Sequence, residues 1–402
     1  MIKQRKSKKS YFNLDLALFH LYQQNSFNGT DLPAKTLCLT FDDGPGSHTL
    51  AIARFLFEHH IQATFFVVGK YAFYHPEILK ELKEMGHLIG NHTYEHPDLP
   101  YYVSVNGDII DQVLRTDAVI KPFVDSDRVY FRAPYGKWSA EVAQELNQSI
   151  LTASHIGPVY WEIAGIDCYY WQNNWPVKDA ADRYLSDIEH NEQRGIVVFH
   201  DEIADMDVVK PHNKTLDLLK ILIPQLLGQG YEFVRLDEIV PIKTASLQEP
   251  KFTLRIGKEK YVCLNNKTDL FANGKPGNPH NLFTLKDLGY GKFAFRAANN
   301  FYLSSAENEI KAKHFEINET EKFDIIPVDK NSIMLRCYDG SYLTLEKGKL
   351  TRNAPFMRQA AIFSYANHNF TINNNISRKQ KLLLFKKQLL FIKSKLQQKL
   401  NF

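Results

Sequence analysis

Cysteine is scarce in this 402-residue sequence, and its four copies stand far apart. They are Cys38, Cys168, Cys263 and Cys337, and no two of them form a C-x-x-C pair. Disulfide frameworks and cysteine-based zinc sites both need cysteines at characteristic short spacings. The scattered positions therefore exclude such a framework and favour reduced thiols, which suit an intracellular protein.

Long apolar runs are missing as well. No stretch contains the roughly 20 consecutive apolar residues that a membrane-spanning helix needs. The basic residues 1–9 are followed by residues 11–22, where Asp15 and His20 interrupt the apolar residues. We therefore expect no secretory signal and a cytoplasmic location.

The chain also lacks a strong net charge, with a formal value of only +4. Residues 1–10 hold five basic and no acidic side chains, and residues 376–402 hold eight and none, which leaves residues 11–375 at −9. A nucleic-acid-binding domain carries its basic residues on its own surface. We therefore expect no nucleic-acid partner for the body of this protein.

The most informative stretch that is present joins an apolar run to two acids. Residues 37–41 have the length of a buried strand, and Asp42, Asp43 and a Gly-Pro-Gly turn follow directly. Adjacent carboxylates repel each other, so their roles must differ, and one could bind a metal while the other acts as a base. A solvated turn with a helix cap is the alternative, because Asp and Gly-Pro are ordinary turn residues.

Two histidines stand four residues apart, at His92 and His96. This spacing would put both side chains on one face of a helical turn. Two imidazoles and one carboxylate form the three-ligand set of hydrolytic zinc sites, which keep one position open for water or substrate. Together with the two acids, this pair predicts a divalent-metal centre.

Residues 40–44 and 92–96 match in full the motifs T-F-D-D-G and H-[ST]-x-x-H of the polysaccharide deacetylase family (NodB-like, carbohydrate esterase family 4), which this chain resembles. Residues 132–136 match its third motif, R-x-P-Y-G, in full. The fifth motif, an apolar strand ending in L-x-H-[DN], is present at residues 198–201 with Val198 in place of Leu.

The fourth motif of the family, D-[SA]-x-D-W, is matched only in part. Asp167 takes the second Asp, whereas Ala164 and Cys168 replace the first Asp and the Trp. The motif Trp helps to wall the pocket in the family, so its loss leaves the shape of that wall open. The aromatic residues that follow, residues 169–171, could substitute for it or could simply be packing residues.

The resemblance implies a metal-dependent hydrolase that removes the acetyl group from an N-acetylated sugar or glycan, such as one containing N-acetylglucosamine, and releases acetate. It implies that a divalent metal, with zinc expected and cobalt as the alternative, is held by Asp43, His92 and His96. It also implies that Asp42 is the catalytic base and that Arg132 orients it. Without the flanking motif, a surface ion pair would explain Arg132.

The resemblance assigns the remaining roles to the later motifs. The backbone N–H of Tyr135 stabilises the oxyanion, and His200, tuned by Asp167, protonates the departing amine. We expect further substrate contacts at Tyr135, Trp171 and Val198. A core histidine with one satisfied nitrogen is the structural alternative for His200.

Residues 35–245 alternate short apolar strand candidates with helical stretches, after a lead-in at residues 1–34. Such alternation predicts β/α units and a parallel sheet. About seven strand candidates indicate a distorted (β/α) barrel, the fold that the resemblance also implies. The motif residues lie at strand carboxyl ends, where β/α barrels place their active sites.

Residues 248–366 lose this alternation and repeat every 40 or 41 residues. Four positions recur in this rhythm: Arg255, Arg296 and Arg336; Tyr261, Tyr302 and Tyr342; Leu270, Ile310 and Leu350; Phe283, Phe323 and Phe363. Three all-β repeats predict a β-trefoil, and the sequences of residues 295–304 and 340–344 resemble those of fascin-like trefoils. We expect the recurring Tyr and Phe residues in its core, and its ligand is unknown.

Residues 376–402 predict a basic amphipathic helix with one apolar stripe. Such a helix can lie peripherally on an anionic membrane, here the inner surface, or can pack on the acidic body of the same chain.

For the whole protein, two alternatives to glycan deacetylation stay open. One is deacylation of a small non-glycan amide, and the other is glycan or filament binding by a protein with an inactive barrel.

Overall fold

The computed structural model describes residues 27–126, 128–164, 166–205, 212–246, 250–257, 260–265, 267–289, 291–329 and 331–367. The predicted helix at residues 376–402 and most of the predicted lead-in at residues 1–34 lie outside these ranges. Among the helices within them, we find none with the length and hydropathy of a membrane-crossing segment.

A parallel sheet forms the centre of the first region, as the alternating pattern predicts. Its strand order is β3-β2-β1-β6, and β7 also pairs with β1. These strands are β1 (Thr36–Asp42), β2 (Thr64–Val67), β3 (Leu88–Asn91), β6 (Arg194–His200) and β7 (Glu232–Phe233). Every residue of β1 and β2 is buried, which explains why both read as continuous apolar runs.

The sheet continues only irregularly beyond β3. The short strands β4 (Val129–Tyr130) and β5 (His155–Ile156) pair in parallel, and a single bridge between Asn91 and Phe131 links them to β3. Residues 159–163 form no regular strand and make only isolated bridges at Val159 and Ile163.

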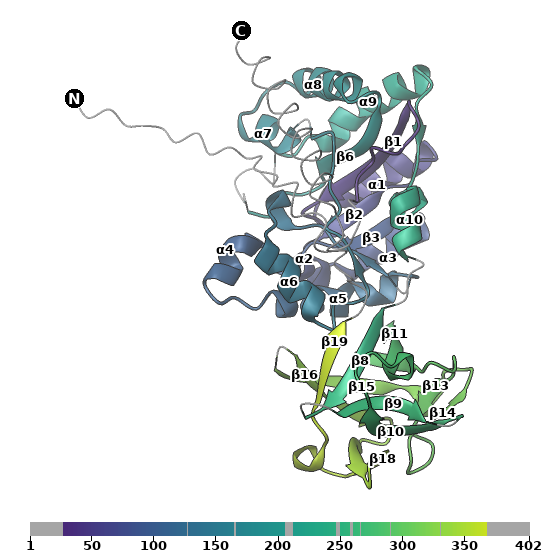
Figure 1. Ribbon diagram of the computed structural model, residues 1–402. Helices are drawn as coiled ribbons and strands as arrows, with labels where there is room; N and C mark the ends of the chain where they lie inside the picture. Colours follow the sequence, from purple (N-terminus) through teal and green to yellow (C-terminus); the bar gives the residue numbers. More distant parts are fainter. Residues whose placement is uncertain are drawn as a thin grey trace, which may run out of the picture. The chain divides into compact units, whose positions relative to one another are not determined.

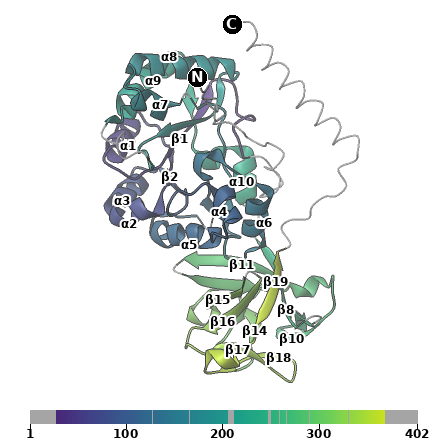
Figure 2. The same cartoon turned by 90° about the vertical axis from the view of Figure 1, so that its left-hand side faces the viewer.

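Helices surround this sheet and succeed one another along its outside in the order α8, α9, α1, α3, α2 and α5 (Figures 1 and 2). The helices are α1 (Thr49–Glu58), α2 (Gly69–Tyr74), α3 (Pro76–Glu84), α4 (Leu99–Ser104), α5 (Ile109–Ile120), α6 (Ala140–Gln148), α7 (Asp167–Gln172), α8 (Val177–His190), α9 (Thr215–Gly228) and α10 (Val240–Ser246). The core beneath them includes Phe41, whose ring stacks on Phe65 at 4.9 Å and on Phe199 at 5.4 Å between centroids. Such pairs hold three neighbouring strands together.

The strand register brings the sequence motifs to one edge of this sheet. Asp42 at the end of β1 is the pairing partner of His200 at the end of β6. His92 follows Asn91, the last residue of β3, and Arg132 follows the bridge at Phe131. Because parallel strands end on the same side, four motifs that are far apart in sequence converge there.

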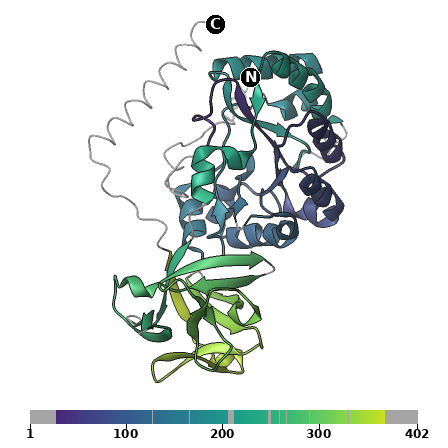
Figure 3. The same ribbon diagram turned by 90° about the vertical axis from the view of Figure 1, so that its right-hand side faces the viewer.

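The described part of residues 250–367 forms one large antiparallel sheet of twelve strands, and its helical segments are single 3₁₀ turns (Figure 3). The strands are β8 (Lys251–Ile256), β9 (Lys260–Asn265), β10 (Asp269–Gly274), β11 (Leu282–Gly289), β12 (Lys292–Arg296), β13 (Tyr302–Ser304), β14 (Lys311–His314), β15 (Phe323–Asp329), β16 (Ser332–Cys337), β17 (Tyr342–Glu346), β18 (Lys349–Ala354) and β19 (Phe363–Asn367). Pairing runs from β8 through β11, β12, β15, β16 and β19 back to β8, which closes a ring. The remaining strands form the hairpins β9–β10, β13–β14 and β17–β18.

The 40-residue rhythm of the sequence corresponds to this strand arrangement. Each recurring Arg is the pairing partner of the Tyr six residues later, as in the pair of Arg255 with Tyr261. The recurring Phe residues are fully buried in one core, as predicted, and the recurring Leu and Ile residues lie in the same core. The recurring Tyr residues are less deeply placed, since Tyr261 and Tyr302 are only half-buried.

Candidate active site

The two adjacent acids at the end of β1 point to different partners. Asp42 is the last residue of the strand, whereas Asp43 has a φ of +79°, in the left-handed region that non-glycine residues seldom adopt. Asp42 reaches Arg132, and Asp43 reaches His92 and His96. Both carboxylates are buried. The change of backbone conformation between the two residues therefore directs their carboxylates to different partners.

His92 and His96 do not lie on a helical turn, so that prediction is wrong. The segment after β3 is a loop in which Thr93 and His96 have φ values of +66° and +61°. Side-chain acceptors shape it, because Asn91 Oδ1 accepts from the Thr93 N–H at 2.8 Å and Thr93 Oγ1 accepts from the His96 N–H at 3.2 Å. The loop still brings the two imidazoles together, with ring centroids 4.9 Å apart.

Asp43, His92 and His96 form a set of three ligand atoms that lie within 4.8 Å of one another. Oδ1 of Asp43 is 3.5 Å from Nε2 of His92 and 3.1 Å from Nε2 of His96. The Nδ1 atoms donate elsewhere, to the backbone oxygen of Arg132 at 2.8 Å and to Asp205 Oδ2 at 2.6 Å. Both Nε2 lone pairs therefore face the carboxylate.

This set fits a divalent metal ion. Within the described residues, the buried Nε2 of His96 makes no hydrogen bond although Asp43 Oδ1 lies only 3.1 Å away, so its lone pair is left for a metal ion. Metal-bound histidines typically donate their other ring N–H to a carboxylate or a backbone oxygen, and both histidines do so here. One carboxylate and two imidazoles also match the ligands of hydrolytic zinc sites.

The charges of the site favour a cation. Burial opposes ionisation of Asp43, but the neighbouring His96 and His92 outweigh it and hold the pKa of this carboxyl well below its ordinary value. Burial likewise opposes the charge on His96, yet Asp43 and Asp205 raise its pKa to about 9. The neighbouring groups therefore favour positive charge at the point where the three ligand atoms meet.

Arg132 is completely buried beside the metal set. Its Nη1 donates to Asp42 Oδ1 at 2.7 Å and to Thr40 Oγ1 at 2.8 Å, and its Nε donates to the oxygen of Val159 at 3.1 Å. The guanidinium also lies over the ring of Phe66, 4.2 Å from its centroid. A surface ion pair, the alternative explanation from the sequence, is wrong because no part of the side chain reaches solvent.

His200 and Asp167 form a second pair of polar groups, of which Asp167 is fully buried and His200 is half-buried. Nδ1 of His200 lies 2.7 Å from Oδ1 of Asp167, and the His200 N–H donates to Oδ2 at 2.8 Å. Burial alone would lower the pKa of His200, but the charge of Asp167 outweighs it and raises that pKa well above its ordinary value. The pair is thus arranged for an imidazole that carries a proton.

Asp205 joins the site although sequence reasoning did not identify it. Besides its bond to His96, Asp205 Oδ2 accepts a hydrogen bond from the hydroxyl of Tyr135. Tyr135 belongs to the third motif and has a φ of +59°. Nothing in the spacing of Asp205 along the chain marks it, since 109 residues separate it from His96.

Strained backbone gathers around these side chains. Non-glycine residues at positive φ occur at five positions in or beside the motifs, namely Asp43, Thr93, His96, Tyr135 and Ile166. Each costs of the order of 1–3 kcal/mol, and such residues persist where the surroundings fix them. Their grouping at one place is typical of a site whose geometry serves a function.

Trp171 and Val198, two of the predicted substrate contacts, lie in the core. Trp171 is only 2% exposed, and its Nε1 donates to Thr215 Oγ1 at 3.1 Å. The exposed aromatics of this segment are Tyr169 and Trp175, at 45% and 43%, whose rings meet edge to face. Substrate contact through Trp171 and Val198 stays a prediction that their burial does not favour.

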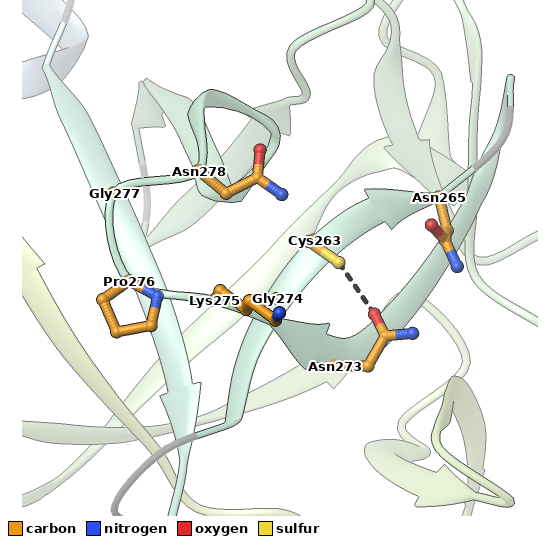
Figure 4. Close-up of a pocket in the computed structure, with 8 residues that line it drawn as sticks. All are labelled: Cys263, Asn265, Asn273, Gly274, Lys275, Pro276, Gly277 and Asn278. Carbon is orange, nitrogen blue, oxygen red and sulfur yellow. Dashed lines mark hydrogen bonds between the residues drawn. The ribbon is translucent and has the colours of Figure 1, made fainter.

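A separate polar hollow of about 480 Å³ lies in the all-β region (Figure 4). Its lining includes Asn265, Asn273, Lys275 and Asn278, and the Cys263 thiol donates to Asn273 Oδ1 at 3.0 Å. None of the predicted site residues contributes to it.

Comparisons with known proteins agree with the motifs. The family model for polysaccharide deacetylase matches residues 29–153. The chitooligosaccharide deacetylase of Sinorhizobium fredii is 32% identical over 213 residues, which cover 51% of this chain and 90% of that protein. The peptidoglycan-N-acetylglucosamine deacetylase PgdA of Listeria monocytogenes is 28% identical over 236 residues, which cover 58% of this chain and 42% of that protein.

Among solved structures, the chain is similar to a peptidoglycan N-acetylglucosamine deacetylase in complex with 4-naphthalen-1-yl-N-oxidanyl-benzamide. The identity is 27%, the TM-score is 0.44, and the match covers 53% of this chain and 91% of that chain. The sheet and its site define a β/α protein with acids and histidines converging at strand carboxyl ends. The relationship to the Sinorhizobium enzyme then gives the assignment: this chain belongs to the polysaccharide deacetylase family.

Proposed function

We propose that this protein is a metal-dependent deacetylase that hydrolyses the N-acetyl amide of a sugar or glycan containing N-acetylglucosamine and releases acetate. The observation that carries the proposal is the buried set of Asp43, His92 and His96, flanked by Asp42 with Arg132. The names of the relatives, which specify chitooligosaccharide and peptidoglycan N-acetylglucosamine deacetylases, support the choice of a glycan.

The metal would be held by Asp43, His92 and His96, with zinc as the expected ion and cobalt as a substitute. When bound, such an ion supplies Lewis-acid polarisation of the acetyl carbonyl and makes a water molecule more acidic. The orphaned Nε2 of His96 and the low pKa of Asp43 both support this assignment.

The chain's own residues would move the protons. Arg132 fixes Oδ1 of Asp42, and Oδ2, which lies 4.0 Å from Nε2 of His92, would accept the proton of the attacking water. His200, whose Nδ1 is bonded to Asp167, would donate a proton from its other nitrogen to the departing amine. The Tyr135 N–H would stabilise the oxyanion, a role that its position in the third motif supports.

We also infer that residues 250–367 are a β-trefoil. The closed ring of six strands, the three hairpins and the buried residues at intervals of about 40 support this architecture. The fascin-like character predicted from the sequence stays a prediction, and we assign this region no ligand.

Acetate release tests the proposed function. Chitooligosaccharides, peptidoglycan, acetylxylan and small N-acetyl amides are offered to the full-length protein, before and after chelation and metal return. We expect acetate from at least one glycan, loss of activity on chelation, and recovery with zinc or cobalt. Activity on small amides alone would favour the non-glycan deacylase, and no acetate from any substrate by the metal-loaded protein would favour an inactive barrel.

A further inference from the structure

Next to the proposed metal centre, a second set of three ligand atoms lies close together. The described residues contain two such groups whose atoms fall within 4.8 Å of one another, and the second consists of Asp167, Cys168 and His200. The thiol is present because Cys168 stands where the family's fourth motif has Trp. This group is therefore a feature of this chain rather than of the motif.

The carboxylate of this group is fixed by surrounding hydrogen bonds. Asp167 is fully buried, and it accepts from the Cys168 N–H at 2.9 Å and from Thr215 Oγ1 at 3.2 Å, besides its two bonds to His200. Thr215 is itself fixed by Trp171, which donates to its hydroxyl. Such outer contacts orient a ligand in the way that metal sites require.

The backbone presents the thiol and the imidazole together. Helix α7 begins at Asp167, directly after Ile166 with its left-handed φ of +55°, so Asp167 and Cys168 both occupy its first turn. His200 ends β6, and its side chain is 22% exposed. Cys168 is likewise half-buried. A small ion can therefore reach the group although its carboxylate is buried.

We propose that Asp167, Cys168 and His200 form a second metal site that takes a thiophilic divalent cation such as Zn²⁺ or Cd²⁺. One thiolate, one imidazole and one carboxylate make a donor set that suits zinc, and the sulfur favours soft ions over Mg²⁺ or Ca²⁺. The first centre has only nitrogen and oxygen ligand atoms, so the two sites should prefer different metal ions.

Occupancy of this site inhibits the enzyme, a consequence that rests on the proposed function. A cation that binds Nδ1 of His200 displaces the proton that this nitrogen shares with Asp167, and the proton passes to solvent. The imidazole then no longer supplies a proton to the departing amine. Zinc is thus required at the first centre and inhibits in excess at the second.

Cobalt titration followed by absorption spectroscopy tests the site directly, without any substrate. Only a thiolate ligand gives a sulfur-to-cobalt charge-transfer band, and the first centre has none. We expect the band in the full-length protein, its loss in Cys168→Ser and Cys168→Ala, and its retention in His92→Ala. Cys263→Ser is the matched control, because that thiol lies in the all-β region, and it should keep the band. A band that survives in folded Cys168→Ser, or no band in the unaltered protein, overturns the proposal.

Zinc inhibition provides the kinetic test. The rate is measured against free zinc for the unaltered protein, Cys168→Ser and Cys263→Ser, each relative to its own maximum. Loss of the thiolate should raise the inhibitory zinc concentration at least about 10-fold in Cys168→Ser alone, because even an outer contact to a metal ligand contributes about 10–100-fold in affinity. Equal inhibition of all three proteins overturns the inhibitory role. If no substrate is turned over, the cobalt band still decides the site, so failure of the proposed function and failure of this inference are distinguished.

Discussion

Nδ1 of His96 lies 2.6 Å from Oδ2 of Asp205, and this carboxylate also accepts the hydroxyl proton of Tyr135. Asp205 therefore connects His96, a proposed metal ligand, with Tyr135, whose N–H is proposed to stabilise the oxyanion. The bond also fixes the tautomer of His96, since a proton on Nδ1 leaves Nε2 free to face Asp43.

We predict that Asp205→Ala lowers zinc and cobalt affinity by about 10–100-fold, the usual cost of losing such an outer contact. Isothermal titration of the metal-free protein measures this affinity. Tyr135→Phe is the matched control, because it removes only the hydroxyl that shares Asp205 and should leave metal affinity near the unaltered value. Unchanged affinity in Asp205→Ala would show that Asp205 does not support the metal site.

The parts of the site that the sequence predicts are those that belong to strand ends. Asp42 and His200 follow apolar runs, and parallel strands bring such positions together whatever their separation in sequence. The contact of Arg132 with Asp42 follows for the same reason. The architecture of the first region is predictable on this basis, because alternating apolar and amphipathic stretches leave few alternatives.

Other features depend on loop conformation, which spacing does not determine. An i, i+4 histidine pair looks the same in a helix and in the left-handed loop that residues 92–96 adopt. Asp205 lies on a loop after β6, and its partners come from two other segments. The burial of Trp171 and the exposure of Tyr169 depend on how α7 is rotated, and three consecutive aromatics do not specify that rotation.

The next prediction separates the adjacent acids. Asp42→Asn should keep the metal and reduce turnover by a factor on the order of 10²–10⁴, the usual contribution of a general base. Asp43→Asn should instead weaken metal binding, because it replaces a ligand. Metal content by elemental analysis and acetate release measure the two effects. Equal metal loss in both variants would contradict this division of roles.

Asp42→Asn should also destabilise the fold, since Arg132 would keep its buried charge without a carboxylate partner. Removing one member of a buried ion pair typically costs about 3–5 kcal/mol. Urea unfolding of the metal-free protein measures the change in the free energy of unfolding. Asp43→Asn is the control for this effect, because Asp43 pairs with His92 and His96 whereas the ion pair of Arg132 is with Asp42. A larger loss of stability in Asp43→Asn would contradict the argument.

A fourth prediction concerns residues 376–402, which lie outside the described part of the chain. Their eight basic and no acidic side chains, together with an apolar stripe, suit an anionic membrane surface, where each charge contributes about 1 kcal/mol. The full-length protein should float with anionic but not with neutral liposomes, and a version ending at residue 370 should not float. Docking on the chain's own acidic body is the alternative, and a full-length protein that never floats would favour it.

The final prediction rests on His87, a buried histidine in the core of the first region. Its Nδ1 accepts from the Ala63 N–H at 3.1 Å, and its Nε2 donates to the Ala53 oxygen at 3.1 Å. Both bonds are satisfied by the neutral ring. Burial lowers the pKa of His87 from 6.5 to about 4, with a smaller opposing contribution from the bond to Ala53.

Between these two pKa values the unfolded chain binds a proton at His87 and the folded chain does not. The contribution of His87 to the free energy of unfolding is therefore fully present above about pH 6.5 and is lost as the pH falls through about 4. The total loss is about 3 kcal/mol. His87→Gln keeps one donor and one acceptor but cannot titrate in this range. Urea unfolding of both proteins across this interval measures the difference, and the free energy of unfolding should fall less steeply with acid in His87→Gln. Carboxylates elsewhere titrate equally in the two proteins, so identical slopes would show that His87 is protonated in the folded state without cost.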